Sequence, residues 1–505
     1  MDKVRIKARV FNGVEIYPEV SLFVSFNKKD EFLPDFVYNS LKEKLKNKLN
    51  RSNLEFEIIS KDLALLREKN VEIIWEDFIE KVVGVVKDFE EVKNPFLLKA
   101  SSFYEEGKIE KAKEVFENID KSSLSNFEKD EYRLLGFMLR DKTEEEFYKE
   151  VEYFSKNPIL LKKLFFHMIK YSQDKREEKL PKKLLSMFEE KFSLEELSDK
   201  EKSVYFYLKG RALYYRGEFI DALKNLIKAK EYAGDEEILA NIYNTSANIF
   251  TDNLYFKEAL SLAKKALEIR EKLQLDEKVN DTLSLIGGIY LKENKLNKAY
   301  EYFKKVNRED SRINNYRAKS AILRGYLNKA KEYIEKSKKL DKKDEKGFIR
   351  SIEMFYLFKK GEDVVKYFED NFVLPEKRKK VDAIVWGSVY SILAEVYKDK
   401  NYKEAFIYLY KGIKELIKEN YILEAYYLSL YPYKWEFDKK LIKEFEDMIR
   451  PFRLNSKIAD YVYKHSEILK KEAKKLGVEI ENDNLKEFYE KMVKKEDVFD
   501  KYNLF

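Results

Sequence analysis

The amino-acid sequence predicts a mostly α-helical protein, in which helix pairs stack into an extended array that follows a small mixed α/β N-terminal domain. The first observation is a register of small and aromatic residues within residues 238–306, where one copy has its markers at Ala247, Phe250, Ala259, Ala263 and Ala266. A second copy repeats the same intervals at Gly287, Tyr290, Ala299, Phe303 and Val306. Apolar residues recur at helical spacing within each half, and a polar turn separates the halves. Each copy therefore predicts two helices that approach closely at their small residues.

The composition supports the same fold class. At 505 residues the chain is too long for one compact core, so several domains or an extended array are expected. Hydrophobic residues make up 44% of the chain and charged residues 38%, which suits thin layers of helices that each have an apolar stripe and a large solvated face. Only 15 Gly and 8 Pro interrupt the helix-forming residues, so the helices are expected to be continuous.

The register extends in both directions from the two clearest copies. Further pairs of small residues, one for each helix of a pair, fall at Ala100 and Ala112, Gly210 and Ala222, Ala318 and Ala330, and Ala394 and Ala405. Between residues 125 and 200 the pattern fades, although the segments there are apolar enough to be packed helices. We expect roughly nine or ten helix pairs between Asn94 and a point beyond Leu409, with irregular units filling the gaps.

The repeated pattern resembles the tetratricopeptide repeat (TPR), a family of helix-turn-helix units. The resemblance implies a right-handed α-solenoid with a general role as a binding scaffold. It divides the chain into a small α/β domain at 1–92, degenerate TPR-like helices at 93–200, a TPR solenoid at 201–420 and a C-terminal helical cap at 421–505.

The first 92 residues differ from the rest. Apolar residues alternate with basic ones from Val4 to Val10, which predicts a half-buried strand ending near the turn signal Asn12-Gly13. A short strand is expected at 14–17, a helix at 33–49, extended segments at 54–58 and 71–75, and then a further helix.

A basic helix predicted in this region indicates an alternative function. Its cations are Lys42, Lys44, Lys46, Lys48 and Arg51, and strand-like residues follow it. This order resembles the recognition helix and wing of bacterial transcriptional activators that couple a winged helix to TPR-like repeats. The resemblance implies DNA binding by the N-terminal domain. The competing interpretation is a solvated, charged helix on a small protein-docking domain.

The residues needed for catalysis are missing from the sequence. There is no Cys, and the only two histidines, His167 and His465, are far apart on separate predicted helices. No zinc-protease spacing, phosphate-binding glycine loop or nucleophile elbow occurs. We therefore expect no enzyme, no metal and no cofactor, and each His is interpreted as an ordinary helix residue.

Charge and hydropathy limit the class of partner and the compartment. The net charge of +7 is small against 193 charged side chains, so no global signature for nucleic acid is present. No apolar run is long enough to span a membrane, and the start of the chain lacks the apolar core of a signal peptide. A cytoplasmic location is expected. The heavy use of Lys and Glu without Cys matches thermophile proteins.

The expected partner is a protein or peptide, bound in the concave groove of the solenoid. In such arrays the first helix of each pair lines that groove. The candidate contact residues are Tyr207, Arg211, Tyr214, Asn241, Asn244, Asn248, Asp281, Ser284, Arg312 and Asn315. Asn is a mediocre helix former, and its carboxamide both donates and accepts hydrogen bonds, which suits an extended peptide. The alternative is that these Asn residues are merely solvated or bond to neighbouring helices.

Overall fold

The structure is a computed structural model of the chain. It describes residues 2–11, 20–26, 55–58, 94–105, 108–124, 126–175, 179–344, 346–372 and 381–494. The chain divides into two compact units, residues 1–164 and 165–505, which are described separately below.

The first unit contains a three-stranded antiparallel sheet with the order β2-β1-β3. Its strands are β1 (Asp2–Phe11), β2 (Val20–Phe26) and β3 (Glu55–Ile58), with Ala8 of β1 opposite Val20 on one side and Ile58 on the other. The alternation at 4–10 and 54–58 thus predicted two strands correctly. The strand β2 was not predicted. The expected strand at 14–17, the helices at 33–49 and after residue 75, and the segment at 71–75 lie outside the described residues.

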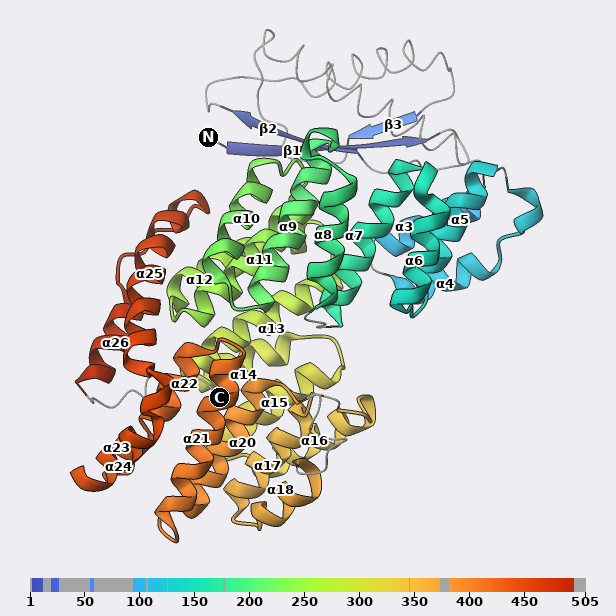
Figure 1. Ribbon diagram of the computed structural model, residues 1–505. Helices are drawn as coiled ribbons and strands as arrows, with labels where there is room; N and C mark the ends of the chain where they lie inside the picture. Colours follow the sequence, from blue (N-terminus) through green and yellow to red (C-terminus); the bar gives the residue numbers. More distant parts are fainter. Residues whose placement is uncertain are drawn as a thin grey trace. The chain divides into compact units, whose positions relative to one another are not determined.

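The rest of the described first unit is helical (Figure 1). Its helices are α3 (Pro95–Glu105), α4 (Ile109–Glu117), α5 (Asn126–Leu139), α6 (Glu144–Tyr153) and the start of α7 (Pro158–Asp174). Ala100 and Ala112, the two predicted small residues, are fully buried where α3 packs on α4. The division between the units falls within α7.

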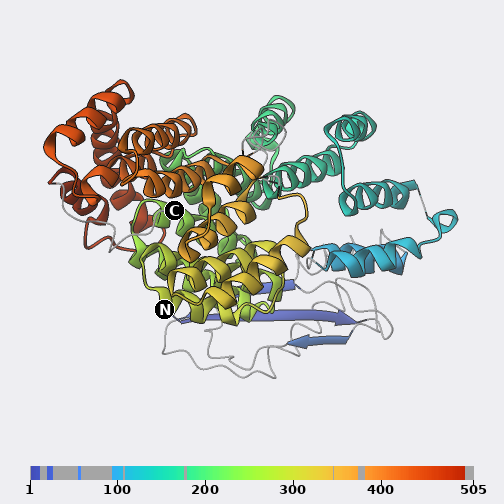
Figure 2. The same ribbon diagram turned by 90° about the horizontal axis from the view of Figure 1, so that it is seen from below.

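The second unit continues with helix pairs that lie side by side (Figures 1 and 2). They are α8 (Leu180–Lys191), α9 (Asp199–Tyr215), α10 (Phe219–Glu231), α11 (Glu236–Asp252), α12 (Phe256–Lys272), α13 (Asp276–Lys292), α14 (Leu296–Lys305), α15 (Ser311–Leu323), α16 (Leu327–Leu340), α17 (Phe348–Lys360), α18 (Val364–Phe372), α20 (Ala383–Tyr397) and α21 (Tyr402–Lys418). From α3 to α21 the described residues form nine successive pairs.

The pairs pack through the small residues of the register. Gly287 on α13 lies against Phe303 on α14 so closely that an added Cβ would be 2.4 Å from the ring Cε1. The second-helix residues Ala222, Ala259, Ala299 and Ala330 are all fully buried. Small residues therefore permit the close approach of two helix backbones, while a neighbouring aromatic ring fills the remaining space.

The turns within pairs share one conformation. Gly217, Leu254, Asn294 and Gly325 each have φ between 56° and 79°, the left-handed region. In each turn the following N–H reaches back to a carbonyl five residues earlier, as Lys295 N does to Tyr290 O at 2.8 Å. This geometry ends the first helix abruptly and sends the chain into the second.

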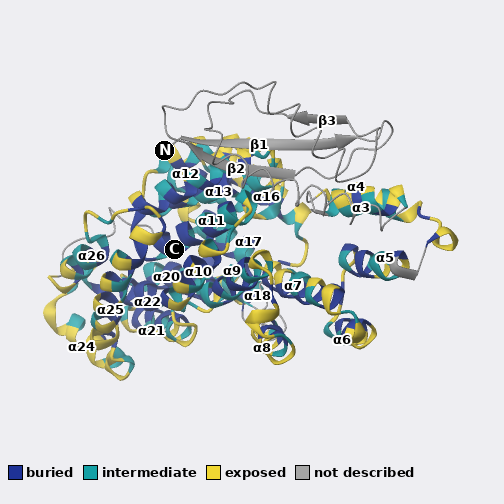
Figure 3. Ribbon diagram, turned by 90° about the horizontal axis from the view of Figure 1, so that it is seen from above, coloured by how far each residue is buried: buried dark blue, intermediate teal, exposed yellow. Residues whose placement is uncertain are grey.

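The C-terminal helices pack back onto earlier repeats. They are α22 (Ile422–Ser429), α23 (Tyr431–Lys434), α24 (Lys439–Ile449), α25 (Leu454–Lys475) and α26 (Asn484–Val493). Helix α22 is buried throughout (Figure 3). Tyr461 of α25 donates its hydroxyl to Asn253 Oδ1 at 2.8 Å, and Tyr255 donates to Asp483 Oδ1 at 2.8 Å, which ties α25 and α26 to the α11–α12 turn.

The second unit also closes on itself. The turn between α21 and α22 meets the turn between α9 and α10, although the two are about 200 residues apart in sequence. A Cβ added to Gly217 would lie 3.4 Å from Asn420 Nδ2. The array from α9 to α21 thus curves until its first and last turns touch.

Candidate functional site

The first helices of the pairs carry two rows of polar residues at equivalent positions. Three residues before the small packing residue stand Tyr207 on α9, Asn244 on α11, Ser284 on α13 and Asn315 on α15. Six residues before it stand Asn241, Asp281 and Arg312. Successive first helices α9, α11, α13 and α15 are in contact with one another, so each row runs across neighbouring repeats.

A buried cation, Arg270 of α12, organises the Asn residues of α11. Its Nη2 donates to Asn241 Oδ1 at 2.7 Å, and its Nη1 donates to Asn244 Oδ1 at 3.3 Å. Nη1 also reaches Thr282 Oγ1 at 2.5 Å and Lys278 O at 2.9 Å on α13. Burial lowers the pKa of Arg270, and these acceptors offset the cost of removing the guanidinium from water.

Arg270 fixes which end of each carboxamide is left for a ligand. Asn241 and Asn244 both use Oδ1 on Arg270, while their Nδ2 groups have no hydrogen-bond acceptor among the described residues. Asn248 is oriented the other way, because its Nδ2 donates to Asn244 O at 3.0 Å and leaves its Oδ1 as the acceptor. The three side chains therefore offer two donors and one acceptor from a single helix.

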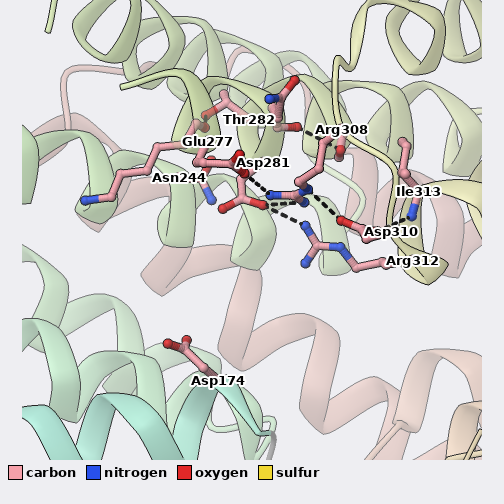
Figure 4. A network of polar contacts seen from close by, with 12 residues as sticks. Asp174, Asn244, Glu277, Asp281, Thr282, Arg308, Asp310, Arg312 and Ile313 are labelled. Atoms are coloured by element: carbon pink, nitrogen blue, oxygen red, sulfur yellow. Dashed lines mark hydrogen bonds and ion pairs between the residues drawn. The ribbon is translucent and has the colours of Figure 1, made fainter. Parts of the chain in front are cut away.

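An ionic cluster covers the start of α13 and α15 (Figure 4). Asp281 Oδ1 accepts from Arg308 Nη2 at 2.9 Å and from Arg312 Nη2 at 3.0 Å. Arg308 also pairs with Glu277 and with Asp310, and Asp310 caps α15 by accepting from Ile313 N at 2.8 Å. The side chains of Asp281 and Arg312 are 42% and 47% exposed, so both stay accessible to a ligand.

Other predicted contact residues are held within the protein. Ser284 differs from the expectation of a free side chain, because it is buried and its Oγ donates to Asn280 O at 2.8 Å in its own helix. Arg211 pairs with Asp174 at 2.6 Å, and Tyr214 donates to Asp252 Oδ2 at 3.0 Å. Asn315 Oδ1 is a buried atom with no hydrogen-bond partner among the residues that the structure describes.

Sequence reasoning missed Arg270, Arg308 and the Asp252–Lys292 ion pair at 2.7 Å. A signal for Arg270 was present in the sequence. It follows Ala259, Ala263 and Ala266 on the apolar stripe of α12, where a charged residue is out of place unless it has partners.

The histidines, possible metal ligands and basic helix considered in the sequence do not form a second site among the described residues. The two histidines lie on α7 and α25, and the described residues hold no group of three or more His, Cys, Asp or Glu side chains placed to bind a metal. Every helix in the described part of the chain is too short or too polar to span a bilayer. Lys42, Lys44, Lys46, Lys48 and Arg51 lie outside the described residues, so DNA binding stays a prediction from sequence.

The helix pairs, their left-handed turns and their small-residue packing decide the fold. It is tetratricopeptide-like. No protein-family profile matches the chain. The chain is 30% identical to the "Protein STIP1 homolog" of Dictyostelium discoideum over an alignment of 172 residues, which covers 32% of this chain and 27% of that protein. The chain thus matches only about a quarter of the length of this relative.

Several solved structures have a similar arrangement of helices. The Rap conjugation gene regulator of plasmid pLS20 in complex with the Phr* peptide is 13% identical, with a TM-score of 0.45 over 65% of this chain and 96% of that one. A Rap protein complexed with competence and sporulation factor is 14% identical, with a TM-score of 0.40 over 79% and 96%. The apo quorum sensor NprR from B. thuringiensis is 17% identical, with a TM-score of 0.37 over 70% and 92%.

Proposed function

We propose that the protein is a non-enzymatic TPR-like scaffold that binds an extended segment of a protein or peptide along the first helices α9 to α15. The observation that carries the proposal is the orientation of the α11 carboxamides. Asn241 and Asn244 have their oxygens on Arg270 and their Nδ2 donors unused, and Asn248 has its oxygen unused. An extended backbone presents carbonyl acceptors and N–H donors in alternation, which matches this set.

The neighbouring charges add side-chain selectivity. Asp281 and Arg312 are paired at 3.0 Å, yet each is exposed enough to exchange part of that contact for a ligand charge. An exposed ion pair is worth little to stability, so its rearrangement on binding costs little. A peptide with charged side chains on either side of its backbone contacts is the expected ligand.

The decisive test uses a peptide array probed with the full chain. Asn241→Asp with Asn244→Asp keeps an oxygen for Arg270 but replaces both free donors with acceptors. We expect peptides that bind the wild type to lose about tenfold or more in affinity, because two hydrogen bonds worth ~1 kcal/mol each disappear. Asn328→Asp is the matched control, since Asn328 is exposed on the second helix α16. If the double variant and the control retain the same peptides equally, the assigned groove is wrong.

A further inference from the structure

A small cavity of about 80 Å³ lies where the array closes on itself. It is bounded by the α9–α10 turn, the end of α11, the α21–α22 turn and α25. Its lining residues are Tyr214, Tyr215, Gly217, Phe219, Asp252, Glu419, Asn420, Tyr421, Ile422, Leu423, Glu424 and Tyr461. We call it the Glu424 pocket. Tyr215, Glu419 and Asn420 are exposed at its mouth, whereas Glu424 and Tyr461 are buried in its floor.

The lining has the chemistry of a cation site. Three of its side chains are carboxylates, five are aromatic, and none is Lys, Arg or His. Carboxylates attract a positive charge directly, and aromatic faces attract it through their quadrupole while covering its apolar stem. These carboxylates would repel an anionic ligand, and a purely apolar ligand would remove them from water without replacing its hydrogen bonds.

Glu424 is the most deeply buried carboxylate of the pocket lining. The residue is only 7% exposed. Its carboxylate accepts a hydrogen bond from its own backbone N–H, and Lys292 of α13 attracts it without forming an ion pair among the described contacts. The nearby carboxylate of Asp252 is already used by Tyr214 and by Lys292. Tyr461 directs its hydroxyl to Asn253 rather than to Glu424. Burying a carboxylate is costly, and a positive group that enters the pocket from outside would offset part of this cost.

We propose that the Glu424 pocket binds the cationic side chain of a Lys or Arg residue of the bound peptide. This inference rests on the proposed function and names a feature of the ligand. Tyr214 and Tyr215 belong to α9, the helix that also carries Tyr207 and Arg211 of the predicted groove. A basic side chain can therefore extend from a backbone on that face into the pocket. The three carboxylates of the lining do not form a group placed to hold a metal ion among the described residues.

The charge of Glu424 gives the site a pH dependence. Burial raises the pKa of Glu424 to about 7, Lys292 on α13 opposes this rise, and Asp252 on α11 adds to it. Tyr461 on α25 also faces the carboxylate. A cation pairs with the ionised form, so binding is expected to strengthen as the pH rises from 6 to 8.

The test measures binding of N-acetyl-arginine amide and N-acetyl-lysine amide to the full chain by saturation-transfer NMR. Their neutral counterpart is N-acetyl-citrulline amide. We expect at least one cationic probe to bind and citrulline to bind about tenfold more weakly. Glu424→Gln, which keeps the shape and removes the charge, is expected to weaken the cationic probe to the level of citrulline and to abolish its pH dependence.

The matched control is Glu258→Gln. Glu258 is another buried carboxylate whose pKa burial raises, but it lies on α12 and does not line the pocket. The control is expected to bind the probes like the wild type. Equal binding of the arginine and citrulline probes, or an unchanged affinity in Glu424→Gln, would overturn the proposal.

The outcome is separable from that of the proposed function. If array peptides bind and depend on Asn241 and Asn244 but show no enrichment in Lys or Arg and ignore Glu424→Gln, the groove stands and the pocket assignment fails. If the cationic probes bind through Glu424 while no peptide depends on the Asn residues, the pocket stands and the groove assignment fails.

Discussion

The Nη2 of Arg270 donates to Asn241 Oδ1 at 2.7 Å, so a residue on the second helix of one pair sets the orientation of a side chain on the first. The same guanidinium crosses to Thr282 on α13. One buried cation thus holds two consecutive repeats together and prepares the surface proposed to bind a peptide.

Arg270→Leu is expected to lower the free energy of unfolding by about 3 kcal/mol, because it leaves one buried and three half-buried acceptors without their donor. Urea denaturation monitored by circular dichroism measures the change. The comparison is Arg312→Leu, which removes an exposed guanidinium paired with Asp281 and should cost about 1 kcal/mol or less. Equal losses in the two variants would show that the Arg270 contacts contribute nothing special.

Two adjacent glycines of α13 are expected to respond in opposite directions. In Gly287→Ala the new methyl group meets the buried ring of Phe303 at 2.4 Å, and this ring is stacked on Tyr316, so a cost of about 1–3 kcal/mol is expected. In Gly288→Ala nothing lies within 4 Å, so the higher helix propensity of Ala should stabilise the protein by about 1 kcal/mol. The melting temperatures of the two variants, compared with that of the wild type, measure both effects. A loss in both variants would contradict the packing described for α13 and α14.

Glu424 is expected to make the protein less stable as the pH rises. Its pKa in the folded chain is about 7, above the ordinary value of 4.5, so the folded state binds more protons between these values. The contribution of this group to the free energy of unfolding is complete below pH 4.5. It decreases by up to about 3 kcal/mol as the pH rises to 7, and it is constant above that. Glu424→Gln should flatten this fall in a series of denaturation curves. Glu419→Gln, at the exposed mouth of the same pocket, should keep it.

His465 is expected to act in the opposite direction. Burial lowers its pKa to about 4 from 6.5, Lys464 lowers it further, and the Tyr461 carbonyl bonded to its Nδ1 opposes both. The ring stacks on Tyr461 with centroids 3.8 Å apart. Stability from the neutral ring is complete above pH 6.5 and is lost as the pH falls towards 4, by up to about 3 kcal/mol.

His465→Phe keeps an aromatic ring in the stack and removes the titrating group. Its unfolding free energy should therefore fall less than that of the wild type between pH 6.5 and 4. The same variant in the Glu424→Gln background separates the two opposing slopes. If the unfolding free energy of His465→Phe falls as steeply as that of the wild type between pH 6.5 and 4, groups other than His465 cause the loss of stability in acid.

Much of the repeat fold could be predicted because it depends on local patterns. The interval between a small residue such as Gly287 and an aromatic such as Phe303 reports the contact within one pair, and both residues are close in sequence. The alternation of apolar and polar residues at 4–10 and 54–58 predicted strands β1 and β3 for the same reason, since it too is a local pattern. Strand β2 was missed because its run VSLFVSF has weaker alternation of apolar and polar residues than β1.

The site was less predictable because it depends on contacts between elements. Periodicity placed Asn241 and Asn244 on the first helix of a pair, as the structure does, but it could not show that Arg270 binds their oxygens. Ser284 occupies the same position of the repeat as Asn244, yet its short side chain bonds to its own helix and is buried. The Glu424 pocket needs residues from α9 and α22, and no sequence interval reports that they meet.

The contact between the Gly217 turn and the Asn420 turn changes how the second unit is expected to unfold. An open row of repeats can fray from either end, since each repeat touches only its neighbours and the loss of one leaves the others intact. Here the turn that follows the last pair, α20–α21, contacts the turn of the α9–α10 pair. Helix α25 also binds the α11–α12 turn through the hydrogen bond from Tyr461 to Asn253. Fraying at the end of the array would expose surfaces near its beginning. Hydrogen exchange should therefore show α9–α12 and α20–α25 opening together as one foldon, with a single protection free energy rather than a gradient along the chain.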